Sequence, residues 1–97
     1  MTGPDESIRR RVRIAGRVQG VGFRESCRRE ARRLGVAGTV RNLGDGSVAA
    51  VFEGPARAVE QMIAWCQHGP RSSHVRSVDV VPEHPTGIVG FAISFSP

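Results

Sequence analysis

The sequence predicts an α/β (α+β) fold, a ferredoxin-like sandwich in which two helices pack on one face of a mainly antiparallel sheet. Three observations support this prediction. Two segments carry apolar residues at helical spacing, and the remaining apolar segments alternate with a period of two. Their order along the chain is βαββαβ followed by a C-terminal strand. Since each predicted helix has one apolar stripe, one face of a single sheet can cover both helices.

The first strand and the first helix are separated by a glycine-rich segment. Ile8, Val12 and Ile14 alternate with arginines, which predicts a half-buried strand. The following helix has an apolar stripe at helical spacing. That stripe consists of Phe23, Cys27, Ala31 and Leu34. Glu25 stands four residues before Arg29, which predicts an ion pair along the helix, and Gly35 predicts where the helix ends.

A β-hairpin is predicted in the middle of the chain. Residues 37–43 and 47–53 have strand composition, and Gly44-Asp45-Gly46 joins them. Asp-Gly between two strands favours a tight turn, because the turn needs positive φ angles. We therefore interpret Asp45 as a turn residue rather than as an acid catalyst.

The last third of the chain predicts a second helix and two further strands. The helix begins at Pro55 and ends at Gly69. Its apolar stripe consists of Val59, Met62, Ile63 and Cys66. Residues 75–81 and 88–95 read as strands. Cys27 and Cys66, the only cysteines, both lie on apolar helix stripes, so we interpret them as core thiols.

The chain length of 97 residues is enough for one domain with one modest core. We expect residues 1–7 to be a flexible leader and residues 8–97 to form the domain. The N-terminal segment has no apolar signal-peptide core, and no apolar run approaches the roughly 20 residues that cross a bilayer. The sequence therefore predicts a cytoplasmic monomer with no membrane partner.

The net charge of +5 comes from 14 basic and nine acidic residues, and every basic residue is an arginine. This balance suits an anionic partner, either a small phosphorylated molecule or a nucleic acid. An alternative explanation is that arginine replaces lysine through codon bias and that the charge mainly maintains solubility. The arginines of the first helix also fit a solvated helix face.

The segment from Gly16 to Arg24 predicts a phosphate-binding loop. Its glycines allow close approach of the backbone, and successive N–H groups in such a turn converge on an anion. The following helix adds the positive end of its dipole, and Arg24 adds a planar set of donors. The spacing differs from that of a Walker loop and of a dinucleotide fingerprint. The alternative is a tight strand-to-helix turn with a solvated arginine.

Two motifs in the sequence resemble those of the acylphosphatase family. Gly16-Arg17-Val18-Gln19-Gly20-Val21-Gly22-Phe23-Arg24 resembles the first signature of that family. Gly38-Thr39-Val40-Arg41-Asn42, followed by Asp45-Gly46, resembles the second. The resemblance extends over about residues 11–95 and rests on two separate motifs at the right interval. One departure is Thr39, which stands where the family usually has an aromatic residue.

The resemblance implies an enzyme that hydrolyses the carboxyl–phosphate bond of small acyl phosphates without a metal ion or other cofactor. Arg24 would be the phosphate-binding catalytic arginine, and Asn42 would orient the attacking water. The phosphate would also contact the backbone amides of the loop residues Gln19, Gly20, Val21, Gly22 and Phe23.

Asn42 is chemically suited to that role, because its carboxamide can accept from water and donate to phosphate. From the residues alone, the favoured interpretation of Asn42 is a turn-capping asparagine beside Gly44; the resemblance favours the catalytic role. Two other functions fit the fold: an RNA-binding module and a catalytically inactive, anion-binding regulatory domain. RNA-binding domains of this topology stack bases on strand aromatics. Because the chain has no Tyr, one Trp and four Phe, we expect no nucleic-acid partner.

Overall fold

The computed structural model describes residue 3 and residues 5–95 of the chain. Seven elements follow one another: β1 (Ser7–Arg17), α1 (Phe23–Leu34), β2 (Ala37–Asn42), β3 (Val48–Pro55), α2 (Ala56–Cys66), β4 (His74–Glu83) and β5 (Phe91–Ile93). This order confirms the predicted βαββαβ arrangement with a further C-terminal strand. No helix in the described part of the chain has the length and hydrophobicity needed to span a membrane.

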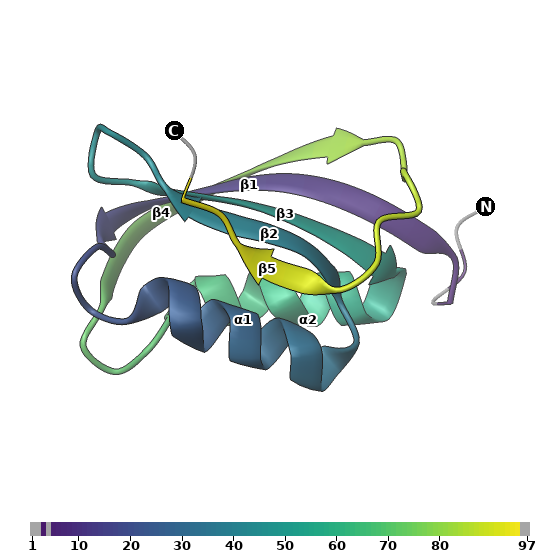
Figure 1. Ribbon diagram of the computed structural model, residues 1–97, viewed down its shortest axis with the longest axis horizontal. Helices are drawn as coiled ribbons and strands as arrows, with labels where there is room; N and C mark the ends of the chain where they lie inside the picture. The colour runs from purple at the N-terminus through teal and green to yellow at the C-terminus, as the bar shows by residue number, and fades with distance from the viewer. Residues whose placement is uncertain (1–2, 4, 96–97) are drawn as a thin grey trace.

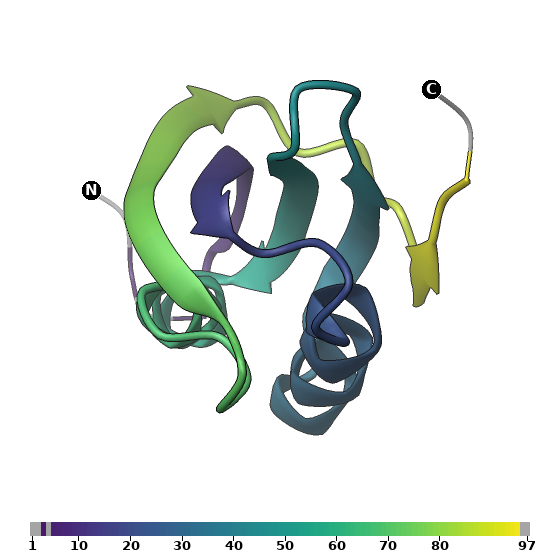
Figure 2. The same ribbon diagram turned by 90° about the vertical axis from the view of Figure 1, so that its left-hand side faces the viewer.

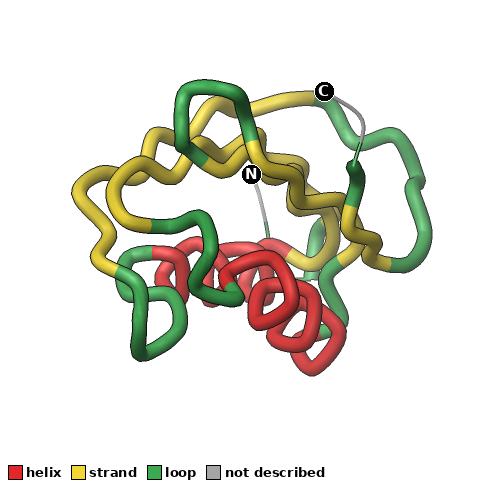
Figure 3. Tube along the Cα trace, turned by 60° about the vertical axis from the view of Figure 1, so that its left-hand side comes forward, coloured by secondary structure: helices red, strands yellow, loops and turns green. Residues whose placement is uncertain are grey.

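The five strands form one sheet in the order β4-β1-β3-β2-β5. The first three neighbouring pairs are antiparallel, and β2 and β5 are parallel. Both helices lie on the same face of the sheet, and the other face is left open (Figures 1 and 3). The predicted ferredoxin-like sandwich is therefore confirmed.

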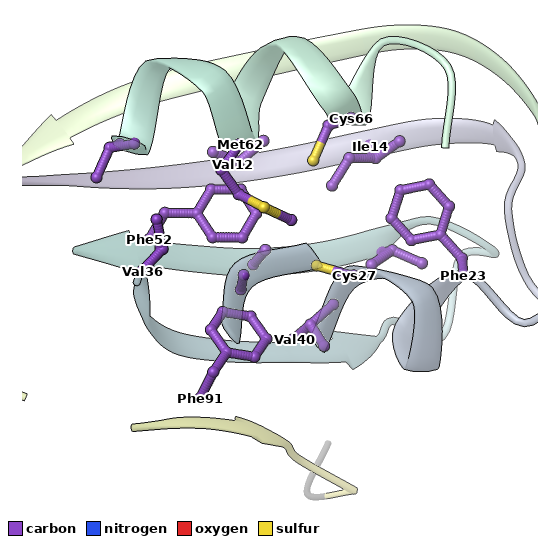
Figure 4. Close-up of a cluster of buried hydrophobic side chains, with 14 of the residues drawn as sticks. Val12, Ile14, Phe23, Cys27, Val36, Val40, Phe52, Met62, Cys66 and Phe91 are labelled. Carbon is purple, nitrogen blue, oxygen red and sulfur yellow. The ribbon is translucent and has the colours of Figure 1, made fainter. Parts of the chain in front are cut away.

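The hydrophobic core lies between the sheet and the two helices (Figure 4). Its largest fully buried side chains include Phe52, Ile14 and Met62. Cys27 and Cys66 face this core from α1 and α2 and are also fully buried. Burial raises the pKa of the Cys27 thiol well above its usual range and that of Cys66 to about 12. Both cysteines are thus protonated core residues, as predicted.

The first helix ends as the sequence predicts, but one predicted ion pair differs. Gly35 follows α1 with φ of 74°, the left-handed conformation that favours glycine at a helix C-terminus. The prediction that Glu25 pairs with Arg29 is wrong, because Glu25 pairs with Arg28. Positions three and four residues apart are both neighbours on a helix surface, so spacing alone did not decide between them.

Residues 43–47 connect β2 and β3, so each strand stops one residue short of the predicted Gly44-Asp45-Gly46 loop, and the backbone conformation of the turn also differs. Of its residues, only Gly46 has a positive φ, at 92°. The Leu43 N–H donates to the Ser47 oxygen at 2.9 Å and closes the loop. Asp45 accepts from the Ser47 N–H at 3.0 Å. Bonds from the Ser47 hydroxyl and N–H, together with Arg13, hold the pKa of Asp45 well below its usual range. Asp45 is therefore a turn residue.

Element boundaries differ from the prediction at both ends of the chain. β1 begins at Ser7, which pairs with Pro55, so the last residue of the predicted leader already belongs to a strand. Residues 1–2 and 4 of that leader lie outside the described residues. β5 contains only residues 91–93 of the predicted 88–95. It begins after Gly90, whose φ of 76° is incompatible with an extended strand.

The connection between β4 and β5 is fastened by one buried carboxylate. Glu53 of β3 is 3% exposed and accepts from Thr86 N–H at 3.0 Å and from Gly87 N–H at 2.7 Å. It also pairs with Arg9 at 3.0 Å. Burial by itself raises the pKa of Glu53, but the bonds from Thr86, Arg9 and Gly87 outweigh it and hold the pKa at about 2. Glu53 thus fixes the segment that leads into β5.

Replacing Glu53 with alanine should destabilise the protein by about 3 kcal/mol, because it leaves Arg9 and two backbone donors without their buried acceptor. The pKa of Glu53 is about 2 in the folded protein and about 4.3 in the unfolded chain. The ionised carboxylate therefore stabilises the fold fully at pH values above the unfolded-state pKa. That stability is lost as the pH falls toward 2. Chemical denaturation from pH 7 to pH 2 measures both effects.

Two variants serve as controls for this prediction. Glu53→Gln keeps the shape of the side chain but removes its titration, so its stability should depend less on pH below 5 than that of the wild type. Glu83→Ala should have a clearly smaller effect at pH 7, since Glu83 pairs with Arg9 and Arg11 at the surface. Equal losses from Glu53→Ala and Glu83→Ala would contradict this account.

Candidate active site

A hollow of about 240 Å³ lies at the end of the sheet where β1 passes into α1. Figure 2 views the molecule from this end, with the β1–α1 loop crossing in front. The loop, the first turn of α1, the end of β2 and the C-terminal segment all contribute to it. The lining residues are Val18, Gly20, Gly22, Phe23, Arg24, Glu25, Asn42, Ile93 and Phe95.

The β1–α1 loop is fastened at its start to the core and to the β2–β3 turn. Val18 is 1% exposed and packs into the core. The next side chain, that of Gln19, points to the turn: its Nε2 donates to the Leu43 oxygen at 2.7 Å and to the Ser47 oxygen at 2.9 Å. These bonds connect the loop to the hairpin that carries Asn42.

The second half of the loop is fastened to the segment that follows α2. The Ser72 hydroxyl donates to the Val21 oxygen at 3.1 Å. Phe23 is buried and its ring lies 5.3 Å from that of Trp65. The backbone of Gly69 lies against the Phe23 ring, so that a Cβ added at Gly69 would be 2.6 Å from that ring. The loop is therefore held in one conformation by packing on both sides.

The loop glycines Gly20 and Gly22 have φ angles of 73° and 76°. A Cβ added at either would meet nothing within 4 Å, so their backbone conformation, and not a lack of space, requires glycine. Within the described residues, none of the N–H groups of residues 19–23 donates a hydrogen bond. A loop with alternating left-handed residues and unpaired N–H groups can bind an anion.

Gly16, which opens the predicted loop motif, has a different role. It lies in β1, where the pairing with β4 shifts register, and its φ is 130°. A Cβ there would lie 2.2 Å from the His74 oxygen. Gly16 thus permits close packing of β1 against β4 and lies outside the hollow.

Arg24 projects from the first turn of α1 and lines the hollow. It forms no ion pair with any described carboxylate, and its guanidinium carbon lies 5.3 Å from the centre of the Phe95 ring. Glu25, the acidic neighbour, is bonded instead to Arg28, and this bond lowers the pKa of Glu25. Arg24 therefore keeps its positive charge available to a ligand, and Glu25 is a poor proton acceptor.

Asn42 lies at the end of β2, and its backbone pairs with Val48. Its Oδ1 is buried and, among the described residues, is without a hydrogen-bond partner. The turn is instead fastened by Asp45 and Gln19, so this conformation does not use Asn42 as the turn cap. Since buried polar atoms nearly always have a partner, the unsatisfied oxygen indicates a place for a water or a ligand.

Most of the predicted site residues line this hollow. They are Gly20, Gly22, Phe23, Arg24 and Asn42. Gln19 and Val21 do not line it: the Gln19 side chain bonds to the hairpin, and the Val21 oxygen accepts from Ser72. Sequence reasoning did not identify Ile93 and Phe95 as lining residues. The period-two spacing of Phe91, Ile93 and Phe95 could have identified them, because it places all three on the helix side of the sheet.

The chemistry of the lining suits an oxyanion beside a water molecule. Backbone N–H groups and one guanidinium neutralise negative charge, and a carboxamide oxygen accepts a hydrogen bond. In the described part of the chain, no three or more His, Cys, Asp or Glu residues are grouped so that they could hold a metal ion. A larger hollow of about 530 Å³ beside β5 contains Arg32, whose Nη2 already donates to the Phe91 oxygen at 3.1 Å.

Comparison with known proteins gives one consistent result. The family model described as Acylphosphatase matches residues 10–93. An acylphosphatase of Thermococcus kodakarensis is 54% identical over 86 residues, which cover 89% of this chain and 94% of the relative. An acylphosphatase of Roseiflexus is 57% identical over 82 residues, which cover 84% of this chain and 88% of the relative. The crystal structure of acylphosphatase from Bacillus subtilis superposes with a TM-score of 0.87 and 34% identity, covering 91% of this chain and 99% of that one.

Replacing Gly20 with alanine should weaken the binding of inorganic phosphate, because an alanine at φ of 73° strains the loop and turns its N–H groups away. The strain should also reduce the free energy of unfolding by about 1–2 kcal/mol. Isothermal titration with phosphate and chemical denaturation measure these two quantities.

The matched control is Gly35→Ala. Gly35 has a φ of 74° and equally open surroundings, but it lies at the end of α1, outside the hollow. It should show a similar loss of stability with unchanged phosphate binding. If the two variants bind phosphate equally well, the loop is not the anion site.

Proposed function

The chain belongs to the acylphosphatase family, and we propose that it cleaves the carboxyl–phosphate bond of small acyl phosphates in the hollow between the β1–α1 loop and Asn42. One observation carries the assignment of the site. Arg24 and the loop residues Gly20, Gly22 and Phe23 line the same hollow as Asn42, whose buried Oδ1 has no described partner. A phosphate and a water molecule would satisfy both sets of groups.

We assign phosphate binding to Arg24 and to the amides of residues 19–23. An acyl phosphate carries its negative charge on the phosphate oxygens. In the transition state this charge is spread over the three equatorial oxygens. The loop donors are fixed by packing before substrate binds, so little reorganisation is needed when the reaction occurs. Arg24 is the charged member of this set and should make the largest single contribution.

We assign the positioning of the attacking water to Asn42. Its Oδ1 can accept a hydrogen bond from the water, but a carboxamide cannot hold a proton near neutral pH. The water attacks phosphorus, the bond to the acyl oxygen breaks, and the carboxylate leaves. The proton of the water passes to a phosphate oxygen of the substrate. Because a carboxylate is a good leaving group, neither a strong general acid nor a metal ion is required.

Two features support a small-molecule substrate over a nucleic acid. On the open face of the sheet, Arg9, Arg11 and Arg13 are all paired with carboxylates. The aromatic residues lie in the core or beside the hollow, where they cannot stack bases on that face. They are Phe23, Phe52, Trp65, Phe91 and Phe95.

We further propose that residues 8–97 act as one domain, since all the residues that line the hollow come from this range, and that this domain acts as a monomer. The cytoplasm is the proposed location, because the two buried cysteines are both free thiols.

In excess EDTA, the wild-type protein should release phosphate from benzoyl phosphate, and Arg24→Ala should be slower by on the order of 100-fold or more. The loss follows from removing the one guanidinium in the hollow. Steady-state phosphate release measures both rates. Dependence of the wild type on an added divalent metal would contradict the mechanism.

Arg29→Ala is the control for Arg24→Ala. It removes one positive charge from the same helix, but Arg29 is exposed and does not line the hollow. Its turnover should be close to normal. Phosphate binding without any turnover in the wild type would instead identify an inactive, anion-binding regulatory domain.

Asn42→Ala should lower kcat by about 100-fold, the effect expected when an attacking group is no longer held in place. Competitive inhibition by inorganic phosphate should remain, because Arg24 and the loop amides are untouched. Initial rates at several phosphate concentrations separate the two quantities.

Thr39→Ala is the control on the same strand. Thr39 lies outside the site hollow, so this variant should turn over normally. If Asn42→Ala abolished phosphate inhibition and kept its turnover, the roles assigned to Asn42 and Arg24 would be reversed.

A further inference from the structure

The C-terminal segment reaches the hollow because its pairing with β2 continues beyond β5. Ile93 pairs with Val40, and the Ser94 N–H donates to the Val40 oxygen at 2.8 Å. The next residue, Phe95, therefore lies alongside Asn42. Figure 1 shows the same arrangement, with β5 running beside β2 toward the end of the sheet where α1 begins.

The hollow has polar and apolar lining residues. The polar ones are the loop glycines, Arg24, Glu25 and Asn42, of which the glycines, Arg24 and Asn42 have been assigned to phosphate and water. The apolar lining residues are Val18, Phe23, Ile93 and Phe95. Val18 and Phe23 are 1% and 2% exposed, so their surface is already used in the core. Accessible apolar surface in the hollow must therefore come from Ile93 and Phe95.

Phe95 is 80% exposed, an unusual state for a large apolar ring beside a polar site. Its ring is held over the guanidinium of Arg24, with 5.3 Å between the guanidinium carbon and the ring centre. This cation–π contact fixes the ring at the edge of the hollow and leaves most of its surface uncovered. A ligand with an apolar part would cover that surface.

We propose that Ile93 and Phe95 bind the acyl group of the substrate and that Phe95 is a specificity-determining residue. This inference rests on the function proposed above. An acyl phosphate, the mixed anhydride of a carboxylic acid and phosphoric acid, has a charged end, which the loop and Arg24 receive, and an acyl end, for which the C-terminal segment supplies the available apolar surface. Acyl phosphates with aromatic or branched acyl groups are therefore preferred over acetyl phosphate.

The test compares kcat/KM for benzoyl phosphate and for acetyl phosphate in the wild type and in Phe95→Ala. The ratio of benzoyl to acetyl phosphate should fall roughly 3- to 10-fold, the range expected for loss of one aromatic contact. Inhibition by inorganic phosphate should be unchanged, because phosphate has no acyl end. Phe95→Leu, which keeps apolar surface without the ring, should give an intermediate ratio.

Val89→Ala is the matched control. Val89 is 89% exposed on the segment before β5 and does not line the hollow, so its ratio should equal that of the wild type. An unchanged ratio in Phe95→Ala would overturn the inference. In particular, if both rates fell equally, Phe95 would only restrain Arg24. Failure of the wild type to hydrolyse either substrate would refute the proposed function itself.

Discussion

The carboxamide of Gln19 joins the two halves of the site. It donates to the carbonyls of Leu43 and Ser47, at the two ends of the β2–β3 turn, from a position inside the β1–α1 loop. The loop carries the anion donors, and the hairpin carries Asn42. This side chain therefore links the loop proposed to bind phosphate to the strand end proposed to position the attacking water. Positioning of this kind, together with neutralisation of charge, is how protein groups accelerate phosphoryl transfer.

The free protein keeps several polar groups unsatisfied at this place. The N–H groups of residues 19–23 have no described acceptor, and the buried Asn42 Oδ1 has no described donor. Gly20 and Gly22 are exposed, so the cost of an unpaired polar group falls on the buried Asn42 Oδ1. The loop itself is held by packing, since Val18 and Phe23 are buried on either side of its glycines. The chain thus combines a rigid frame with polar groups that remain available to the proposed ligand.

The sequence by itself determined the fold class and predicted an anion-binding loop. Helical and alternating periodicities are local properties, and they predicted both helices and the order of the helices and strands along the chain. Gly20 and Gly22 were identified because positive φ angles restrict residue type. Arg24 and Asn42 were predicted as site residues from two motifs, whose residue types and interval are visible without any structure. What is local in the chain, or repeated in a family, can be read from the sequence.

The tertiary structure decided which groups meet. Gln19 and Val21 looked like other loop residues, but their contacts with Ser47 and Ser72 cross the fold. Phe95 lies 71 positions beyond Arg24, and only the parallel pairing of β5 with β2 places it over that guanidinium. The ion pairs that occupy Arg9, Arg11 and Arg13 are likewise set by strand order. Contacts between distant segments depend on how the whole sheet assembles, and no local pattern encodes them.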